Sequence, residues 1–253
     1  MYKLIKRIYI SVCPSVIRNR LDISIRKLIY IIIYRGNNYK CNICEAELKK
    51  FIKYKFENSE DLICPKCGSL SRTRALCFYI EDKIPSINKM LEFSPHRSFY
   101  DYWTNKDVDY TANDFENEFL AHTHHSITSM PFNDNSFDLI LCYHILEHIK
   151  EDDKAIKELF RILSENGVLL LQVPFSSGST LEDLSITSSE KRKELYGQED
   201  HVRYYGKEDF IDKLKLYGFD VNACLYTESL NDEIIRVYGL DKHDTIFICK
   251  IKA

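Results

Sequence analysis

The sequence lacks a long apolar segment. The longest unbroken apolar run near the N-terminus, residues 28–34, has only seven residues, whereas a helix that crosses a bilayer needs about 20. We therefore expect no membrane span there. With 45% hydrophobic and 29% charged residues in a chain of 253, the composition predicts a globular protein with one full-sized domain and a smaller appendage.

The chain also lacks a strong excess of either charge, since its formal net charge is -3. Residues 1–35 hold eight lysines and arginines and one aspartate, a charge of +7, so the remainder carries -3 - 7 = -10. Proteins that grip phosphate backbones need clustered cations. The acidic body therefore argues against nucleic acid as a partner.

A signal peptide is not evident. Charged residues interrupt the N-terminal segment, and no small-residue cleavage site follows an apolar core. Nine cysteines in a secreted chain would suggest disulfides, but without such a signal we expect a cytoplasmic protein with reduced thiols.

Residues 1–35 are basic and apolar by turns. Apolar residues between 21 and 33 recur at helical spacing, and Pro14 is expected to separate two short helices. The pattern predicts a basic amphipathic helical segment. Its apolar stripe either packs on the chain's own body or makes a peripheral contact with an anionic membrane surface or a partner. The oligomeric state is not readable from the sequence.

Two Cys-x-x-Cys pairs follow, and nineteen residues separate them. They are Cys41 with Cys44, and Cys64 with Cys67. Each pair points two sulfurs at one position, and two pairs complete the tetrahedral thiolate shell that zinc prefers. Because four protein ligands leave no open position, we expect structural zinc in a small unit over residues 36–70, rather than a catalytic ion or a redox dithiol.

From residue 70 onward, helical and strand patterns alternate, which predicts a parallel, doubly wound α/β sheet. The predicted strands are 90–93, 108–112, 125–128, 137–142, 167–173, 219–226 and 245–251, and the predicted helices are 70–83, 152–163 and 210–217. The segment 176–206 shows no such pattern. A loop of this length is usually a lid or a binding element, and the alternative is a solvated loop.

These residues resemble the class I S-adenosylmethionine-dependent methyltransferases. The resemblance covers residues 88–253, and its most specific part is the series Met-Pro-Phe, Asn-Ser-Phe-Asp and Leu-Glu-His between 130 and 148. The cysteine pairs, the run from Gly68 to Arg74 and residues 198–201 also resemble a bacterial subgroup with an N-terminal zinc ribbon. The resemblance implies a Rossmann-like, mostly parallel seven-stranded sheet in a methyltransferase domain over residues 71–253, with an acceptor lid at 176–206. It also implies S-adenosylmethionine across the carboxyl ends of the first four strands.

The resemblance assigns cofactor-binding roles to residues at those strand ends. The family follows the acid of its first strand with three glycines at alternate positions, and here Glu92 is followed by Ser94, His96 and Ser98. Close backbone approach is therefore replaced by side chains that can hydrogen-bond the cofactor carboxylate. Asp114, 22 positions after Glu92, would accept both ribose hydroxyls. The other implied cofactor contacts are Phe93, Ser126, Ile127 over the adenine, Cys142, Tyr143 and His144. Histidines 122, 124 and 125 have no carboxylate partner at a fitting spacing, so we interpret them as a loop cluster.

Methyl transfer from a sulfonium is an in-line displacement that needs a positioned acceptor and a base with a pKa near 7. His201 on the predicted lid is the preferred base, and His148 after the fourth strand is the second candidate. Asp200 would orient His201, and Arg203 would bind an anionic acceptor through its bidentate fork. Gln198 and Tyr205 complete the predicted acceptor site.

The class of acceptor is predicted from a sequence motif that this chain lacks. Relatives that methylate amides and bases carry an Asn/Asp-Pro-Pro-aromatic loop where this chain has Cys142-Tyr-His-Ile145. We therefore expect methylation of oxygen on a small polar or anionic molecule, and the resemblance suggests surface-polysaccharide sugars, sugar phosphates or phosphate-linked groups. Two alternatives remain open: an RNA methyltransferase that uses the zinc ribbon to bind nucleic acid, and a non-catalytic zinc-scaffolded interaction module.

Overall fold

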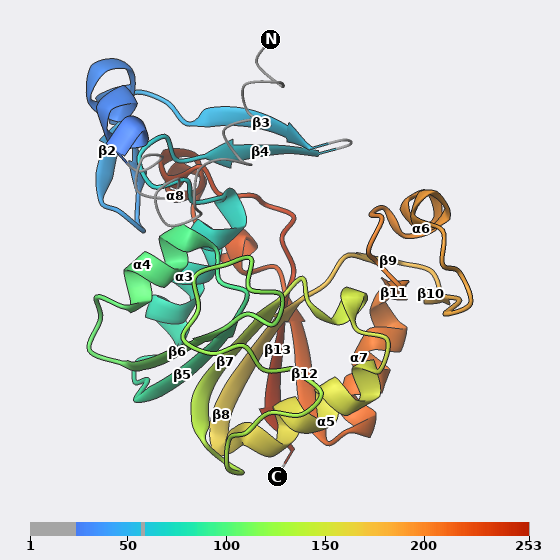
Figure 1. The fold of residues 1–253 in the computed structure, drawn as a ribbon. Helices are drawn as coiled ribbons and strands as arrows, with labels where there is room; N and C mark the ends of the chain where they lie inside the picture. Colours follow the sequence, from blue (N-terminus) through green and yellow to red (C-terminus); the bar gives the residue numbers. More distant parts are fainter. Residues whose placement is uncertain (1–23, 57–58, 253) are drawn as a thin grey trace. The chain divides into compact units, whose positions relative to one another are not determined.

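The computed structural model describes residues 24–56 and 59–252, which form two compact units (Figure 1). The first contains the described residues up to Asp82 together with Thr227–Lys242, and the second contains Lys83–Tyr226 and the chain from His243 onward. This division differs from the predicted boundary at residue 70. The helix that follows the cysteine pairs and the segment 227–242 both group with the first unit.

Among the described residues, the first unit contains two antiparallel hairpins and, besides the helical segment at residues 24–34, two further helices. Strand β1 (Arg35–Cys41) pairs with β2 (Ala46–Leu48), and β3 (Ile52–Phe56) pairs with β4 (Ser59–Ile63). One Cys-x-x-Cys pair begins at the end of β1, and the other follows β4 directly. The helices are α3 (Ser71–Lys83) and α8 (Asp232–Tyr238).

The predicted amphipathic segment falls partly on the described residues, and residues 1–23 lie outside them. Residues 24–29 are α-helical and continue into the π-helical turn η1 (Tyr30–Tyr34). The isoleucines of this segment and its one leucine, Leu28, are exposed, and Ile32 exposes 71% of its surface. In the part of the chain that the structure describes, no helix has both the length and the apolar character to cross a membrane.

The second unit is organised by a sheet of six strands among the described residues, in the order β12-β13-β8-β7-β5-β6. Strand β13 runs antiparallel to both of its neighbours, and the other neighbouring pairs are parallel. The sheet is therefore mostly parallel, as the sequence predicts, with β13 as the one antiparallel strand among the described residues. The strands are β5 (Lys89–Phe93), β6 (Asp109–Asn113), β7 (Phe137–Tyr143), β8 (Leu163–Gln172), β12 (Phe219–Cys224) and β13 (Ile246–Ile251).

The prediction of seven strands in this sheet is wrong by one, because residues 125–128 do not form a strand. An isolated bridge between Asn113 and Thr123 is the pairing found in this region. The Asn113 amide nitrogen donates to the His125 carbonyl at 2.9 Å, and the Asn113 amide oxygen accepts from the His125 backbone N–H at 2.8 Å. A side chain thus satisfies the backbone groups that a strand ladder would otherwise pair.

Helices α5 (Asp152–Ile162) and α7 (Lys207–Leu216) pack on one face of this sheet (Figure 1). The apolar residues of α5 recur at helical spacing, so they form a single stripe that is buried together with side chains from β5, β7 and β8. The short helix α4 (Arg97–Trp103) contacts β6 through Tyr100 and Tyr110, whose ring centroids lie 6.0 Å apart.

Residues 176–206 are not the structureless loop that the sequence predicts. They contain β10 (Leu181–Glu182), α6 (Ser189–Tyr196) and β11 (Arg203–Gly206), and a second small sheet has the order β10-β11-β9 with β9 (Phe175–Ser176). Ser188 caps α6 by accepting a hydrogen bond from the Lys191 backbone, and Gly197 ends the helix in the left-handed conformation. Two short 3-10 turns, η2 (Leu146–His148) and η3 (Tyr226–Ser229), complete the described elements.

Candidate functional site

The four paired cysteines converge in the first unit. The Cys41 and Cys67 sulfurs are 3.7 Å apart, and the Cys44 and Cys64 sulfurs are 3.8 Å apart. Sulfurs about 2.3 Å from a tetrahedral zinc ion are separated by about 3.8 Å, whereas a disulfide needs about 2.05 Å. The four thiols are therefore spaced to bind one tetrahedral zinc ion, as the sequence spacing predicts. Such an ion would have no open coordination position.

The buried arginine Arg74 holds the chain around this cluster. Its guanidinium donates to the carbonyls of Ser69 at 2.6 Å, Leu62 at 2.8 Å and Gly239 at 2.7 Å. It also stacks on Phe51, with 4.2 Å between the guanidinium carbon and the ring centroid. One charged side chain thus joins β4, the turn after the second cysteine pair and the end of α8.

In the second unit, three neighbouring parallel strands end beside one another and deliver Ser94, Asp114 and His144. These residues follow β5, β6 and β7, which are adjacent in the order β7-β5-β6. The Ser94 N–H donates to the Asn113 carbonyl at 2.8 Å, and the Ser94 hydroxyl donates to Asp114 Oδ1 at 2.7 Å. The carboxyl edge of a parallel sheet is where α/β proteins bind ligands.

Two of these residues have a backbone conformation that glycine usually adopts. The φ angle is 44° at Ser94 and 55° at His144, both in the left-handed region that is costly for residues with a Cβ. Such conformations concentrate at functional sites, where surrounding contacts maintain them. The first loop therefore turns in the left-handed way that a glycine permits, although its sequence has none.

The Asp114 carboxylate is committed to contacts within the protein. Its Oδ2 accepts from the backbone N–H groups of Glu118 at 2.6 Å and Phe119 at 2.9 Å. Asp114 itself is only 2% exposed. A ribose hydroxyl would have to bond Oδ1, the oxygen that already accepts from Ser94. The contacts of Asp114 thus leave room for a hydrogen bond from one ribose hydroxyl, whereas the sequence predicts hydrogen bonds from both.

Glu92 is buried on β5 and bonded to a tyrosine. Its Oε2 accepts from the Tyr110 hydroxyl at 2.7 Å. Burial raises the pKa of Glu92 to about 8, and the hydrogen bond from Tyr110 opposes that rise only in part. The carboxyl group is therefore held mainly in its neutral form at pH 7.

This shift predicts a pH dependence of stability. The unfolded pKa is near 4.5 and the folded pKa is about 8, so the folded state binds the extra proton between these values and stability falls as pH rises through them. The free energy of unfolding should drop by at most about 5 kcal/mol over this window, from roughly 1.4 kcal/mol per unit of pKa. Urea unfolding followed by the fluorescence of Trp103, the single tryptophan, measures this in the second unit.

Glu92→Gln should flatten that pH dependence relative to the wild type. Glu116→Gln is the matched control, because Glu116 is exposed on the loop after β6. An unchanged slope in the Glu92 variant would contradict the assignment.

The remaining predicted cofactor residues have mixed environments. The His96 side chain caps α4 by accepting from the Ser98 N–H at 3.3 Å. Ile127 is buried in the same apolar cluster as Phe93. Cys142 is fully buried, and burial raises the pKa of its thiol well above the usual value. The residues that retain some solvent exposure are Ser94, His96, Ser126, Tyr143 and His144.

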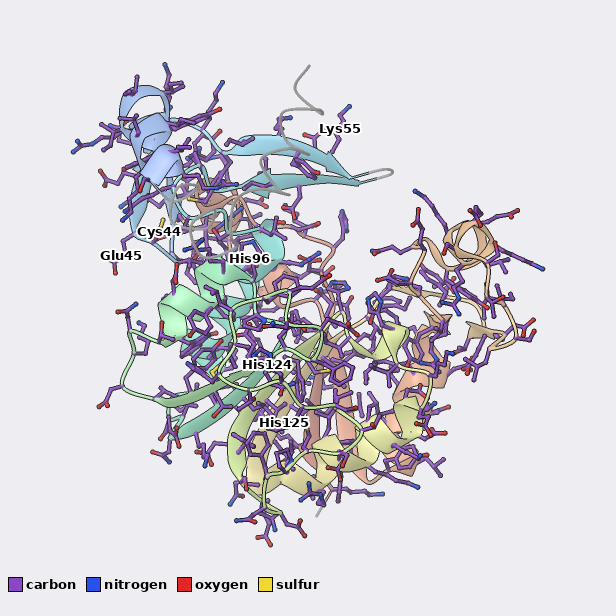
Figure 2. All side chains as sticks on the ribbon, viewed as in Figure 1. Cys44, Glu45, Lys55, His96, His124 and His125 are labelled. Atoms are coloured by element: carbon purple, nitrogen blue, oxygen red, sulfur yellow. The ribbon has the colours of Figure 1, made fainter. Side chains whose placement is uncertain are left out.

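Among the side chains that the structure describes, the loop histidines are not part of a group whose ligand atoms lie close enough to share a metal ion. His124 and His125 are exposed in the loop that follows β6 (Figure 2). Nδ1 of His122 accepts from the Ala112 N–H at 3.0 Å. His122 therefore pairs with the backbone of β6.

Arg203 does not have the predicted environment of an acceptor-binding residue. It is 0% exposed, and its guanidinium donates to the carbonyls of Leu146 at 2.9 Å and Lys150 at 3.0 Å and to that of Ile149. It also contacts the Glu182 carboxylate at 3.2 Å. Its donors are therefore used to hold the turn after β7 against β11.

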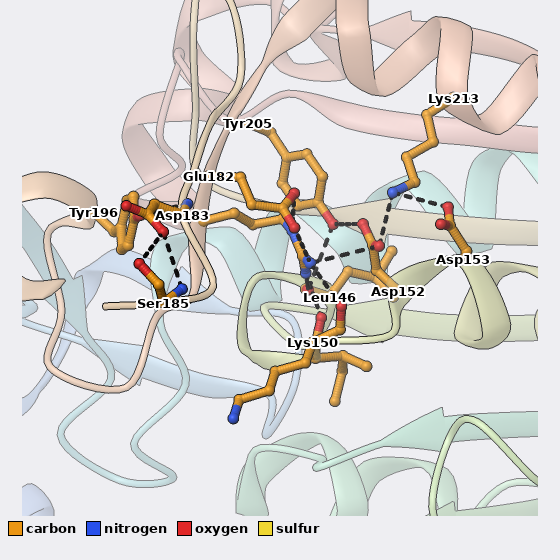
Figure 3. Close-up of polar contacts among 12 residues, drawn as sticks. Leu146, Lys150, Asp152, Asp153, Glu182, Asp183, Ser185, Tyr196, Tyr205 and Lys213 are labelled. Atoms are coloured by element: carbon orange, nitrogen blue, oxygen red, sulfur yellow. Dashed lines mark hydrogen bonds and ion pairs between the residues drawn. The ribbon is translucent and has the colours of Figure 1, made fainter. Parts of the chain in front are cut away.

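Tyr205 has a structural environment as well. Its hydroxyl donates to Asp152 Oδ2 at 2.7 Å, and Lys213 donates to the other oxygen of Asp152 at 2.7 Å (Figure 3). Lys213 also pairs with Asp153 at 3.0 Å. The predicted acceptor role is thus replaced, for Arg203 and Tyr205, by a buried ionic network that joins α5, β11 and α7.

The two candidate bases do lie together. The His148 and His201 ring centroids are 4.7 Å apart. Asp200 contacts His148, with 3.1 Å between its Oδ2 and Nδ1 of that ring, rather than orienting His201 as predicted. Burial lowers the pKa of His201, which favours a neutral imidazole. Gln198 is exposed nearby in the sequence.

Sequence reasoning missed Glu147, which lies between these groups. It is 0% exposed, and one ligand atom each of Glu147, His148 and His201 lies within 4.8 Å of the others. Its position in the Leu-Glu-His run was visible, but the sequence gives no sign that residue 201 returns to meet it.

Comparison with known proteins gives a match over part of the second unit. Residues 99–171, from α4 to β8, match the family model described as a methyltransferase domain. An uncharacterized protein of Methanocaldococcus jannaschii is 46% identical over 48 residues, which are 19% of this chain and 21% of that protein. The uncharacterized methyltransferase YcgJ of Bacillus subtilis is 42% identical over 43 residues, 17% of each chain. The matches thus span about a fifth of these relatives.

The crystal structure of YcgJ from Bacillus subtilis aligns with 71% of this chain and 98% of its own, with 15% identity and a TM-score of 0.49. The match of residues 99–171 covers the strand ends after β6 and β7, where Asp114 and His144 stand. The match of residues 99–171 to the family model, and not the likeness to that structure, supports a methyltransferase domain in the second unit.

Proposed function

We propose that this chain is an S-adenosylmethionine-dependent methyltransferase that O-methylates a small polar or anionic acceptor. Suitable acceptors are a sugar of a surface polysaccharide, a sugar phosphate or a phosphate-linked group. The observation that carries the proposal is the match of residues 99–171 to a methyltransferase domain. The sheet order supports it, since β7, β5 and β6 end side by side.

The carboxyl edge of these strands offers groups suited to the donor. Ser94 and the free lone pair of Asp114 Oδ1 can meet a ribose hydroxyl, and the left-handed turn at Ser94 brings backbone to the same edge. Glu92, held neutral by burial, can donate as well as accept. When bound, S-adenosylmethionine supplies an electrophilic methyl group; the protein has to orient the acceptor and exclude water.

We assign the acceptor side of the site to the turn after β7 and the residues before β11. His148 and His201 are the groups there that can accept a proton, with 4.7 Å between ring centroids. Gln198 and Asp200 are exposed and can reach a polar acceptor, whereas Arg203 and Tyr205 act by holding this part of the chain in place. The preference for oxygen rests on the absence of an Asn/Asp-Pro-Pro-aromatic loop after β7.

Calorimetric titration with S-adenosylmethionine tests the proposal. The wild type should bind it, and Asp114→Ala should bind it about 10–100-fold more weakly, because a hydrogen bond to a charged group contributes roughly 1.5–3 kcal/mol. Glu116→Gln is the matched control, two residues further along the same loop and exposed. Trp103 fluorescence verifies that each variant is folded.

If the wild type does not bind S-adenosylmethionine at millimolar concentration, the proposed enzymatic function is wrong, and a non-catalytic interaction module is favoured instead. If the cofactor binds, methylation assays with soluble metabolites, nucleotide-linked sugars and RNA identify the acceptor. Salt-sensitive methylation of RNA alone would replace the small-molecule assignment.

A further inference from the structure

Three groups that commonly bind metal ions gather in the second unit, far in sequence from the cysteine pairs. Glu147 and His148 come from η2, and His201 stands two residues before β11. One ligand atom of each lies within 4.8 Å of the others. The chain thus brings two imidazoles and a carboxylate together from segments more than fifty residues apart.

The hydrogen bonds of both imidazoles leave one nitrogen of each ring available. Nδ1 of His201 lies 3.0 Å from the Tyr196 carbonyl oxygen. A carbonyl only accepts, so this nitrogen carries the proton and Nε2 of a neutral ring keeps its lone pair. Nδ1 of His148 lies 3.1 Å from the Asp200 carboxylate, with the same consequence. Histidines that bind metal ions usually donate their other N–H to a carbonyl or carboxylate in this way.

Glu147 provides an independent sign of a cation. It is 0% exposed, and its Oε1 lies 3.2 Å from Nδ1 of His144. Among residues 24–56 and 59–252, its buried Oε2 has no hydrogen-bond partner. A carboxylate oxygen without a partner is costly to bury, and a bound cation would remove that cost.

The backbone around these residues is held by contacts that do not use their side chains. The Val202 N–H donates to the Glu147 carbonyl at 2.9 Å. The Arg203 guanidinium donates to the Leu146 carbonyl at 2.9 Å. The two segments are therefore locked together directly beside the three side chains, which is the preorganisation that a metal site needs.

We propose that Glu147, His148 and His201 bind one divalent transition-metal ion. Two imidazole nitrogens and one carboxylate suit Mn²⁺, Fe²⁺, Co²⁺ or Zn²⁺ better than Ca²⁺ or Mg²⁺, which prefer all-oxygen ligands. Three protein ligands leave coordination positions open for oxygen. If the proposed methyl transfer holds, this oxygen is a hydroxyl of the acceptor. The bound ion would then lower the pKa of that hydroxyl, and the two imidazoles would act as ligands in place of a base.

Cobalt titration of the full chain, with its cysteine site first saturated with zinc, tests this site. After dialysis, the wild type should retain one cobalt in addition to one zinc per chain. Its visible spectrum should show cobalt bound by nitrogen and oxygen, without the thiolate charge-transfer band that displacement of zinc from the cysteines would produce.

Three variants and one control decide the outcome. Glu147→Gln and His201→Asn should each lose the cobalt equivalent. Asp200→Asn, whose side chain is 68% exposed and whose change spares the fold, should weaken cobalt binding about 10–100-fold. His125→Gln, an exposed loop histidine, should bind cobalt as the wild type does. A wild type that retains no cobalt, or an Asp200 variant with unchanged affinity, would overturn the site.

Calorimetry with S-adenosylmethionine separates this proposal from the proposed function. Cofactor binding without cobalt binding would remove the metal site alone. Cobalt binding without cofactor binding would leave the site standing and remove the methyltransferase.

Discussion

Replacing Cys64 by serine is expected to remove zinc from the first unit and to unfold it. The described hairpins are short, and four thiolates converge between them. Structural zinc contributes roughly 10–16 kcal/mol of apparent binding free energy in small zinc units, which exceeds the stability of a typical small domain. Loss of one thiolate ligand should therefore lower the free energy of unfolding by more than the total stability of this unit.

Metal analysis and limited proteolysis measure this effect. The wild type should hold one zinc at the cysteines, and Cys64→Ser should lose it and become cleaved between residues 36 and 70. Cys77→Ala is the matched control, because Cys77 is equally buried in the same unit but lies outside the cluster. A Cys64 variant that keeps wild-type protease resistance would show that zinc does not stabilise this unit.

Replacing Arg203 by methionine is expected to lower the free energy of unfolding of the second unit by about 3–5 kcal/mol, the usual cost of breaking a buried ion pair from one side. The change leaves the carbonyls of Leu146 and Lys150 without their donor. Asp152 keeps Tyr205 and Lys213 but loses its contact with the guanidinium. Urea unfolding followed by Trp103 fluorescence measures the loss.

Lysine at the same position should recover little of this stability, because a single ammonium group cannot reach several carbonyls in the fork geometry of a guanidinium. Arg192→Met is the control. Arg192 is half-buried and donates to the Ile186 carbonyl at 3.0 Å, so its loss should cost about 1 kcal/mol. Wild-type stability in Arg203→Lys would mean that charge alone, and not the carbonyl contacts, supports this turn.

The strands of the main sheet were predictable because their signal is local. β5, β6 and β7 each form within two residues of their predicted bounds, since short apolar runs bounded by polar turns have few other ways to be buried. The strand predicted at 125–128 was wrong because the side chain of Asn113, twelve residues earlier, takes over its backbone hydrogen bonds. A pattern within four residues carries no information about that partner.

The roles of charged residues were predictable only where spacing decides them. Arg203 and Tyr205 were predicted to meet an acceptor because they are polar and lie within the segment 176–206, the predicted acceptor lid. Both are buried instead against η2 and α5. Glu147 was treated as part of a motif, and its contact with His144 and its position beside His201 depend on the return of the chain before β11.

The amino-acid sequence by itself determined the α/β class, the two Cys-x-x-Cys pairs and the positions along the chain of the six strands of the main sheet. In each case the decisive contacts lie within a few residues, or repeat with the period of a helix or strand. Only the tertiary structure decided which polar side chains face one another. Whether an arginine binds a ligand or donates to buried carbonyls depends on segments fifty or more residues away. A local sequence pattern does not determine the free energy of such long-range contacts.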